Sequence, residues 1–510
     1  MKYINLYSYL LIFLLFFSCT KLNEKFRSNL EEGDDIAAAE LLVTAYNMLN
    51  SPYQQGSRWC LQELSSDEAI APTRGGDWDD NGRHRAIHLH TWNADNDYLS
   101  GCFNSFGAAV FQSSNVLRNN PTKQQAAEAR FIRALALFDM VDLWGKAIYR
   151  EDLINFKLDP IILEAKEGLD FIIKEVNEIM PDLPSGVPAF VASQNAARVL
   201  LMKVYLNRGA FLNRESPSFL PDDMNKVIEL ANQITGYTIS LPGKYFDNFA
   251  PDNDEKSTEN IFTLYNKEGV RGGSVGNTYN TIAHYNMNPG GWNGWATLSA
   301  FYNKFSAGDE RLGFDYRYTG FDKPNPAKNK TVGFLVGQQY NLTTGAPLMA
   351  RNPSTQTLSF TPEITLRTSG STLETAGIRV LKYAYDYASK AGQKNNDWVI
   401  YRYADVLLMK AEAILRGGAG TAAEALAIVN GIRNNRGAAA LLSLTLDNLL
   451  DERGRELYWE GWRRQDLIRY NKFLGSWETK PESGKPKELV YAFPSQQIAV
   501  NPALKQNPGY

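Results

Sequence analysis

Apolar residues recur at alternating intervals of three and four along several stretches of this chain, a spacing that places them on one face of a helix. The clearest stretch runs from Ala127 to Val141 and ends near Trp144-Gly145. Further helices are expected over residues 165–179, 192–211, 222–236, 397–416, 421–436 and 446–472. Helices that follow one another in pairs of roughly 35–40 residues predict a mainly α fold, a tetratricopeptide-like array of helix pairs in an α-α superhelix.

Two segments rich in Gly, Asp and Asn interrupt the helical pattern. The first is a tryptophan-rich loop at residues 51–97, and the second is a large irregular segment at residues 241–396. We therefore expect an N-terminal helical region over residues 19–240, which carries the loop. A C-terminal helical region over residues 397–510 is expected to complete the same fold.

The charge balance of the chain excludes one large class of partners. Its 53 Lys and Arg against 56 Asp and Glu give a formal net charge of −3, and no dense basic run is present, so no nucleic-acid ligand is expected. A hydrophobic share of 44% excludes an intrinsically disordered chain. Three cysteines are too few for a disulfide framework or a structural zinc cluster.

The first 19 residues have the form of a secretory signal. Lys2 precedes an apolar stretch over residues 4–17, which is shorter than the ~20 residues of a membrane-spanning helix. Ser18-Cys19 resembles the lipobox of bacterial lipoproteins, so residues 1–18 are predicted to be a lipoprotein signal peptide and Cys19 the lipidated residue. An ordinary signal peptide with an incidental cysteine is the alternative. Cys60 and Cys102 then remain, either as a disulfide or as separate thiols.

Tryptophan is concentrated in the irregular parts of the chain. Residues 56–100 and 271–300 hold all four histidines and five of the ten tryptophans, which are Trp59, Trp78, Trp92, Trp292 and Trp295. Loops offer little core in which to bury a tryptophan, and flat aromatic faces beside Asn, Asp and Arg suit stacking on sugar rings. Packing of the loops onto the helical body is the alternative for each of them, and Trp295 is expected to pack against the helix that follows it.

Metal-binding and catalytic motifs are weak in this sequence. Asp77, Asp79 and Asn81 fit the first half of a calcium loop, but its twelfth position, which should be a bidentate Glu, is His88. Calcium is thus an alternative to the absence of any cofactor. No phosphate-binding loop, nucleophile elbow or paired-cysteine motif is present. The dense run of charges from Glu452 to Asp466 is expected to form ion pairs within and between helices.

Five motifs, in order along the chain, resemble those of the SusD/RagB family. They are Glu128-Ala129-Arg130-Phe131-Ile132-Arg133-Ala134 with Leu143-Trp144-Gly145, Pro289-Gly290-Gly291-Trp292-Asn293-Gly294, Tyr401-Arg402-Tyr403-Ala404-Asp405, the run from Glu452 to Arg469, and the ending from Asn501 to Tyr510. Because they occur in family order, the resemblance covers essentially the whole mature chain. It implies a SusD-like fold of four helix pairs, with an irregular segment that carries ligand contacts.

The resemblance also implies a function. Such proteins are non-enzymatic lipoproteins of the cell outer membrane that capture oligosaccharides for a SusC-like TonB-dependent transporter. A peptide- or protein-binding RagB-like uptake receptor is the alternative, and a secreted glycan hydrolase is a more remote one. Surface-exposed members often carry acidic residues after the lipidated cysteine. This chain has Thr20-Lys21-Leu22-Asn23 there, so a periplasmic orientation stays open beside the expected surface display.

The family places its ligand on loops from both irregular parts of the chain, where aromatic residues are dense. The predicted stacking platforms are Trp78, Trp92, Trp292 and Tyr285. Guanidinium and amide groups donate to hydroxyl oxygens, and the amide also accepts. The predicted readers of sugar hydroxyls are therefore Arg83, Asn93 and Asn96.

Overall fold

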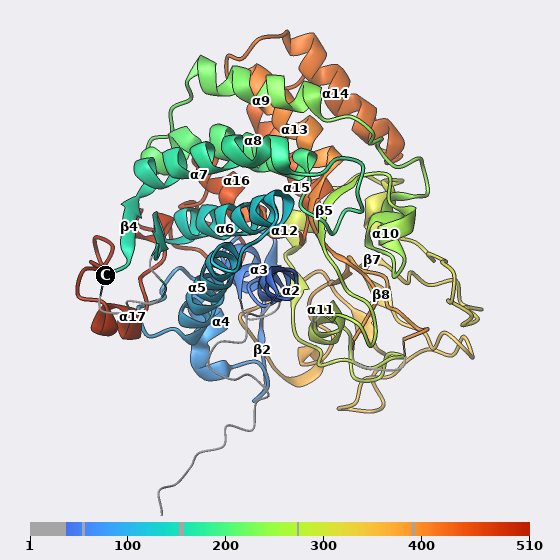
Figure 1. Cartoon of the computed structure of the whole chain (residues 1–510). Helices are drawn as coiled ribbons and strands as arrows, with labels where there is room; N and C mark the ends of the chain where they lie inside the picture. The colour runs from blue at the N-terminus through green and yellow to red at the C-terminus, as the bar shows by residue number, and fades with distance from the viewer. Residues whose placement is uncertain (1–36, 54–56, 152, 154–157, 273–274, 390–392) are drawn as a thin grey trace, which may run out of the picture. The chain divides into compact units, whose positions relative to one another are not determined.

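The computed structural model describes residues 37–53, 57–151, 153, 158–272, 275–389 and 393–510. Within these residues the chain is mainly helical, as predicted, with sixteen α-helices and several short two-stranded sheets (Figure 1). The predicted signal peptide and Cys19 lie outside the described residues. None of the described helices is long and apolar enough to cross a membrane.

The helices fall into an N-terminal and a C-terminal group. The first group comprises α2 (Ala38–Asn50), α3 (Arg58–Leu64), α4 (Arg83–His88), α5 (Asp97–Leu117), α6 (Lys123–Trp144), α7 (Ala165–Ile179), α8 (Gln194–Leu212) and α9 (Pro221–Gln233). The irregular segment holds α10 (Asn253–Lys256), α11 (Val275–Ile282) and α12 (Ser299–Tyr302). The second group comprises α13 (Tyr403–Leu415), α14 (Ala422–Asn435), α15 (Leu446–Leu457), α16 (Arg463–Arg469) and α17 (Ser495–Val500).

Consecutive long helices pack side by side. From α5 to α9 each helix lies against the next, and α13 packs against both α9 and α14 (Figure 1). The helix α6 illustrates how the sequence sets its ends: Thr122 and Gln125 form a capping box at its start, and Gly145 ends it with a φ of 78°. Its buried residues include the predicted positions from Ala127 to Val141, but every residue from Ala134 to Trp144 is buried, so this half of the helix is enclosed on all sides and not on one face only. The predicted array of helix pairs is therefore confirmed.

Two predicted helices differ from the observed ones. Residues 397–416 begin with a strand, β12 (Trp398–Arg402), which pairs antiparallel with β5 (Asn260–Leu264) before α13 starts. The single helix expected over residues 446–472 is wrong, because α15 and α16 are separated by a turn in which Trp459 and Gly461 have positive φ angles. The N–H groups of these two residues donate to side-chain carboxylates, of Glu68 at 3.0 Å and Glu63 at 2.5 Å, instead of to helix carbonyls.

The charged run that begins at Glu452 forms a buried ion-pair network, as predicted. Arg311 of the irregular segment lies 2.8 Å from Glu452 and 2.9 Å from Glu456. Arg402, at the end of β12, lies 2.6 Å from Glu456 and 2.8 Å from Glu460. These pairs join the irregular segment and β12 to α15. Because removing one partner of a buried pair leaves an uncompensated charge, the network fixes these parts relative to one another.

Short sheets bring the tryptophan-rich loop against the irregular segment. The strand β1 (Ala69–Ile70) pairs antiparallel with β6 (Ala296–Thr297), and β2 (Thr73–Arg74) pairs parallel with β10 (Arg367–Thr368). The remaining strands are β3 (Lys146–Tyr149) with β4 (Ile161–Glu164), β7 (Gly333–Leu335) with β11 (Arg379–Leu381), and β8 (Gly337–Gln338) with β9 (Ser359–Phe360). The pairs of β1 and β2 place residues 75–80 beside the loop that precedes β6.

Trp295 and Cys102 are both buried, and their surroundings decide whether the tryptophan packs inside the protein and whether the thiol forms a disulfide. Trp295 is fully buried and stacks on Trp59 with ring centroids 4.6 Å apart, so it is a packing residue as predicted, but this partner lies on α3 and not on the helix that follows Trp295. Cys102 is a buried free thiol, which means that it forms no disulfide with Cys60. Burial raises the pKa of the Cys102 thiol well above its usual range.

Candidate binding site

Three aromatic side chains from two distant segments surround one open depression. Trp78 follows β2, whereas Tyr285 and Trp292 lie in the loop between α11 and β6. Trp292 is 43% exposed, and the other two are half-buried, so all three keep surface in contact with solvent. The side chains of Asp77 and Asp80 line the same depression. The depression thus combines flat aromatic groups with hydrogen-bond acceptors.

The loop that carries Trp292 approaches Trp78 closely. A Cβ atom on Gly294 would lie 2.3 Å from Cζ2 of Trp78, so the absence of a side chain lets the indole ring rest against the backbone. The indole Nε1 of Trp78 donates to the carbonyl of Trp292 at 2.9 Å. The Pro289–Gly294 motif therefore has a physical role, because it holds one tryptophan against the backbone of the other.

Two buried arginines hold this loop from the interior. Nε of Arg74 donates to the carbonyl of Gly294 at 3.1 Å, and its terminal nitrogens donate to two further carbonyls. Arg379 donates to Oδ1 of the buried Asn293 at 2.7 Å and to nearby carbonyls. Burial lowers the pKa of Arg74 to about 9. Both guanidinium groups act as multiple donors that tie irregular backbone together.

Tyr285 is held at its hydroxyl and on one face of its ring. The hydroxyl donates to Oδ2 of Asp77 at 2.9 Å, and the guanidinium of Arg351 lies 3.7 Å from the ring centroid. Glu374 accepts from the N–H of Arg351 at 2.6 Å and lies 2.8 Å from Nε2 of His284. Burial, together with Asp77, raises the pKa of Tyr285 to about 12. Its hydroxyl therefore remains a donor at neutral pH.

The other predicted site residues lie around a second depression. It is lined by Arg83, Trp92, Asn93 and Asn96, and the turn Asp80–Gly82 contributes residues to both depressions. Asn96 is 6% exposed and caps α5, where its Oδ1 accepts from the N–H of Tyr98 at 3.0 Å. Its amide is thus committed to the helix end, while Asn93 stays exposed.

Arg83 has protein partners as well. Its Nη1 pairs with Asp97, and its Nε donates to the carbonyl of Asp80 at 2.8 Å. Its side chain is 31% exposed, so part of the guanidinium remains open to a ligand. The seven predicted residues therefore divide into an aromatic group around the first depression and a mainly polar group around the second.

Trp92 does not have the surface position expected of a stacking platform. It is only 3% exposed, and its ring lies near His90 and Tyr491, at centroid distances of 5.2 Å and 4.5 Å. Its Nε1 donates to the hydroxyl of Tyr510 at 2.6 Å. A ring that is almost fully buried and has its polar atom engaged offers no stacking surface for a sugar, so Trp92 is a packing residue that joins the loop to the C-terminal residues.

The calcium candidates also have protein partners. Oδ1 of Asp79 lies 2.8 Å from Nη1 of Arg85, a cation that takes the place of a metal, and Asp77 accepts from Tyr285. Asn81 lies in a turn with a φ of 54°. Within the described residues, no three His, Cys, Asp or Glu side chains form a group that could hold a metal ion.

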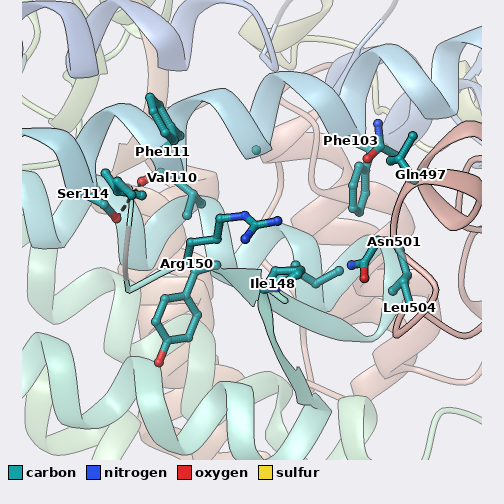
Figure 2. A pocket seen from close by; sticks show the side chains of 14 residues that line it. Phe103, Val110, Phe111, Ser114, Ile148, Arg150, Gln497, Asn501 and Leu504 are labelled. Carbon is teal, nitrogen blue, oxygen red and sulfur yellow. Dashed lines mark hydrogen bonds between the residues drawn. The ribbon is translucent and has the colours of Figure 1, made fainter. Parts of the chain in front are cut away.

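A separate cavity of about 250 Å³ contains none of the predicted site residues (Figure 2). It lies between α5, β3 and the residues around α17, and Phe103, Val110 and Leu504 supply much of its apolar lining. Asn501 and Gln497 lie at one end and Phe111 at the other (Figure 2). Its lining includes aromatic residues but, unlike that of the first depression, no Asp or Glu.

Sequence reasoning missed two residues that belong to the aromatic depression or support it. Asp80 lines the depression, and its place between the candidate residues 79 and 81 was the available signal. Arg351 reaches Tyr285 from a loop 66 residues further along the chain, and no local pattern marks it. A contact of this kind depends on the tertiary fold alone.

Known sequences similar to this chain are SusD or SusD-like proteins. The sequence profile of the SusD family matches residues 244–491. The starch-binding protein SusD of Bacteroides thetaiotaomicron is 27% identical over 427 residues, which cover 76% of this chain and 73% of that protein. SusD-like protein P2 of Formosa agariphila is 23% identical over 480 residues, 85% of each chain.

Solved structures share the fold. A SusD superfamily protein from Parabacteroides distasonis superposes with a TM-score of 0.69 at 18% identity, covering 93% of this chain and 98% of that one. Surface glycan-binding protein A from Bacteroides thetaiotaomicron, solved in complex with laminarihexaose, gives a TM-score of 0.68 at 18% identity, covering 92% and 98%. The mainly helical fold is therefore SusD-like. The motifs, the profile match and these relatives agree that the chain belongs to the SusD/RagB family, whose members are non-catalytic binding proteins.

Proposed function

We propose that this protein binds oligosaccharides at the aromatic depression. The observation that carries the proposal is the convergence of Trp78, Tyr285 and Trp292 around one open surface with Asp77 and Asp80. The apolar faces of sugar rings stack on flat aromatic groups, and carboxylates accept hydrogen bonds from sugar hydroxyls. This combination is less suited to a peptide backbone, whose recognition usually depends on an exposed strand edge or a groove.

Relatives support a glycan as the ligand class. One of them is described as starch-binding, and a structural neighbour was solved with laminarihexaose bound. Both descriptions concern those proteins, which are 27% and 18% identical to this chain. We therefore propose a glycan as the class of ligand.

The proposal also includes a location and a partner. The predicted lipidation of Cys19 would anchor the protein in the outer membrane, facing the cell surface. There it would capture a glycan without cleaving it and pass it to a SusC-like TonB-dependent transporter. Family membership supports both points. Bacterial lipoproteins need several acyl chains for stable anchoring, since a single chain gives only marginal membrane binding.

Within the second depression, two polar residues extend the proposed site. Asn93 and the open part of Arg83 can hydrogen-bond to a ligand that continues past the turn Asp80–Gly82. Asn96 and Trp92 are assigned to helix capping and packing instead.

The test begins with a glycan array on the purified protein, followed by calorimetric titration with the glycan that binds best. Trp292→Ala should weaken binding by roughly two- to tenfold, the equivalent of ~0.5–1.5 kcal/mol of aromatic interaction. Phe111→Ala is the matched control, because Phe111 is 41% exposed but lies on α5 in the other cavity, and it should bind as the wild type does. An array without a bound glycan, or full displacement of the glycan by peptides, would contradict the proposal.

A further inference from the structure

A cavity of about 270 Å³ lies on a part of the molecule that the proposed glycan site does not use. Its walls come from the ends of α13 and α16, the start of α15 and the connection between α8 and α9. A water molecule occupies about 30 Å³ in the liquid, so the cavity has room for a ring-sized molecule, roughly nine waters. Its polar lining has features that the packing of the fold does not explain.

The first feature is a buried arginine with unused hydrogen-bonding capacity. The side chain of Arg416 is only 7% exposed and lies between Phe219 and Tyr470, with its guanidinium carbon 3.7 Å and 4.6 Å from the two ring centroids. Its Nε donates to Glu412 at 2.7 Å. Its Nη2 is buried and has no hydrogen-bond partner within the described residues.

The second feature is an unpartnered phenol beside it. Tyr470 is 9% exposed, and its hydroxyl is also buried without a hydrogen-bond partner within the described part of the chain. Leaving a buried donor unsatisfied costs about 1–3 kcal/mol. Two such donors, on two residues that stack on each other and line one cavity, are therefore evidence for an acceptor that comes from outside the chain.

The third feature is the ammonium group of Lys472, which can leave its present ion pair at a small cost in free energy. Lys472 lines the same cavity, and its Nζ lies 3.2 Å from Oδ1 of Asp447, with both side chains more than half exposed. An exposed pair of this kind contributes about 0–1 kcal/mol, so an anionic ligand can displace Asp447 from Lys472. The guanidinium of Arg469, by contrast, is fully engaged by Asn207, Glu412 and Asp466.

We propose that this cavity is a second binding site, separate from the aromatic depression, that takes an oxyanion held by Arg416, Tyr470 and Lys472. A guanidinium, a phenol and an ammonium all donate to oxygen, and charge-assisted hydrogen bonds to carboxylate or phosphate are the strongest that these groups make. The oxyanion is either a free ion such as phosphate or the carboxylate of a sugar acid, and the volume of the cavity accommodates both.

The test measures the thermal unfolding midpoint of the purified protein as inorganic phosphate or glucuronate is added, against chloride at equal ionic strength. In the wild type, the midpoint should rise and saturate with at least one of the two. Tyr470→Phe is the decisive variant. It removes a hydroxyl that has no partner, so without added anion its midpoint should equal or exceed that of the wild type.

With the anion present, Tyr470→Phe should need about tenfold more of it for the same shift, since a hydrogen bond to a charged group is lost. Arg416→Gln should abolish the response. Arg208→Gln is the matched control, because Arg208 is paired with Asp170 at 2.7 Å outside the cavity, and it should respond as the wild type does. A tighter response to glucuronate identifies a sugar acid as the ligand, and a tighter response to phosphate identifies a free ion.

Two outcomes would overturn the proposal. One is a wild-type midpoint that rises no more with phosphate or glucuronate than with chloride. The other is an equal response in the wild type and Tyr470→Phe, which would show a general effect of salt. Trp292→Ala should keep the response, because the two sites share no residue.

Discussion

A buried pair of carboxyl groups should make the stability of this protein fall as the pH rises. Glu63 and Glu68 receive the N–H groups of Gly461 and Trp459 and so support the turn between α15 and α16. Burial raises the pKa of Glu63 from 4.5 to about 7, and it raises that of Glu68 as well. The folded state therefore holds a proton on Glu63 that the unfolded state has already lost above pH 4.5.

The sign and size of the effect follow from this difference. A raised carboxyl pKa contributes stability that is present below the unfolded value and lost as the pH rises through the folded one. For Glu63 the loss between pH 4.5 and pH 8 is about 3 kcal/mol of unfolding free energy. Glu63→Gln keeps an oxygen for the N–H of Gly461 and removes the titration, so its stability should depend less on pH by about that amount.

Urea unfolding at several pH values between 4.5 and 8 measures the effect directly. The quantity to compare is the change in unfolding free energy across this range, wild type minus variant, because raised carboxyl groups outside the Glu63–Glu68 pair, such as Asp397, contribute equally to both. Glu40→Gln, in an exposed position on α2, is the control and should follow the wild type. Parallel pH profiles for the wild type and Glu63→Gln would refute the assignment of a protonated, buried carboxyl group.

Three further changes test other parts of the structure. Trp92→Ala should destabilise the protein by ~3–5 kcal/mol in urea unfolding, because the ring is buried, whereas Trp292→Ala should cost far less; equal losses would contradict the assigned roles. Gly294→Ala places a Cβ 2.3 Å from the ring of Trp78, so we expect ~1–3 kcal/mol of destabilisation and weaker glycan binding in calorimetry. Cys19→Ala should move the protein from the membrane fraction to the soluble fraction of cells that lack the transporter; continued membrane attachment there would exclude lipidation at this residue.

The helices were predicted correctly where local spacing decides the structure. The prediction failed where a group distant in sequence interrupts a helix. The stretches that became α6 and α7 have periodic apolar residues and clear end signals, so their limits lie close to the predicted ones. The break after α15 depends on Glu63 and Glu68, which are almost 400 residues away in sequence and capture two N–H groups. Local pattern contains no information about such a contact.

The candidate site shows the same division. High aromatic density marked two loops that the fold brings together, since Trp78 and Trp292 line one depression. Density could not separate a tryptophan that faces solvent from one that is buried. For Trp92 that difference is made by Tyr491 and Tyr510 near the chain end, which only the complete fold brings to it.

The buried arginines are of two kinds: some pair with carboxylates, and others donate to backbone carbonyls. The second kind supports the loop beside the depression that Asp77 and Asp80 line. Arg311 and Arg402 do not line the depression. They are paired with Glu and Asp side chains, so their charges are compensated inside the protein. Arg74, behind the loop of Trp292, donates to backbone carbonyls instead, and with a pKa of about 9 it stays charged at neutral pH. Arg74 therefore fixes the loop without forming an ion pair with a carboxylate.

This arrangement leaves the acidic groups of the depression free to face outward. The carboxylate of Asp77 has the hydroxyl of Tyr285 as a donor, and that of Asp80 lies 3.1 Å from His84 and accepts from Tyr98. A carboxylate can accept about four hydrogen bonds, so both retain acceptor positions for sugar hydroxyls. An arginine paired with Asp77 or Asp80 would have occupied those acceptor positions. The depression would then offer aromatic rings without the acceptors that orient a sugar on them.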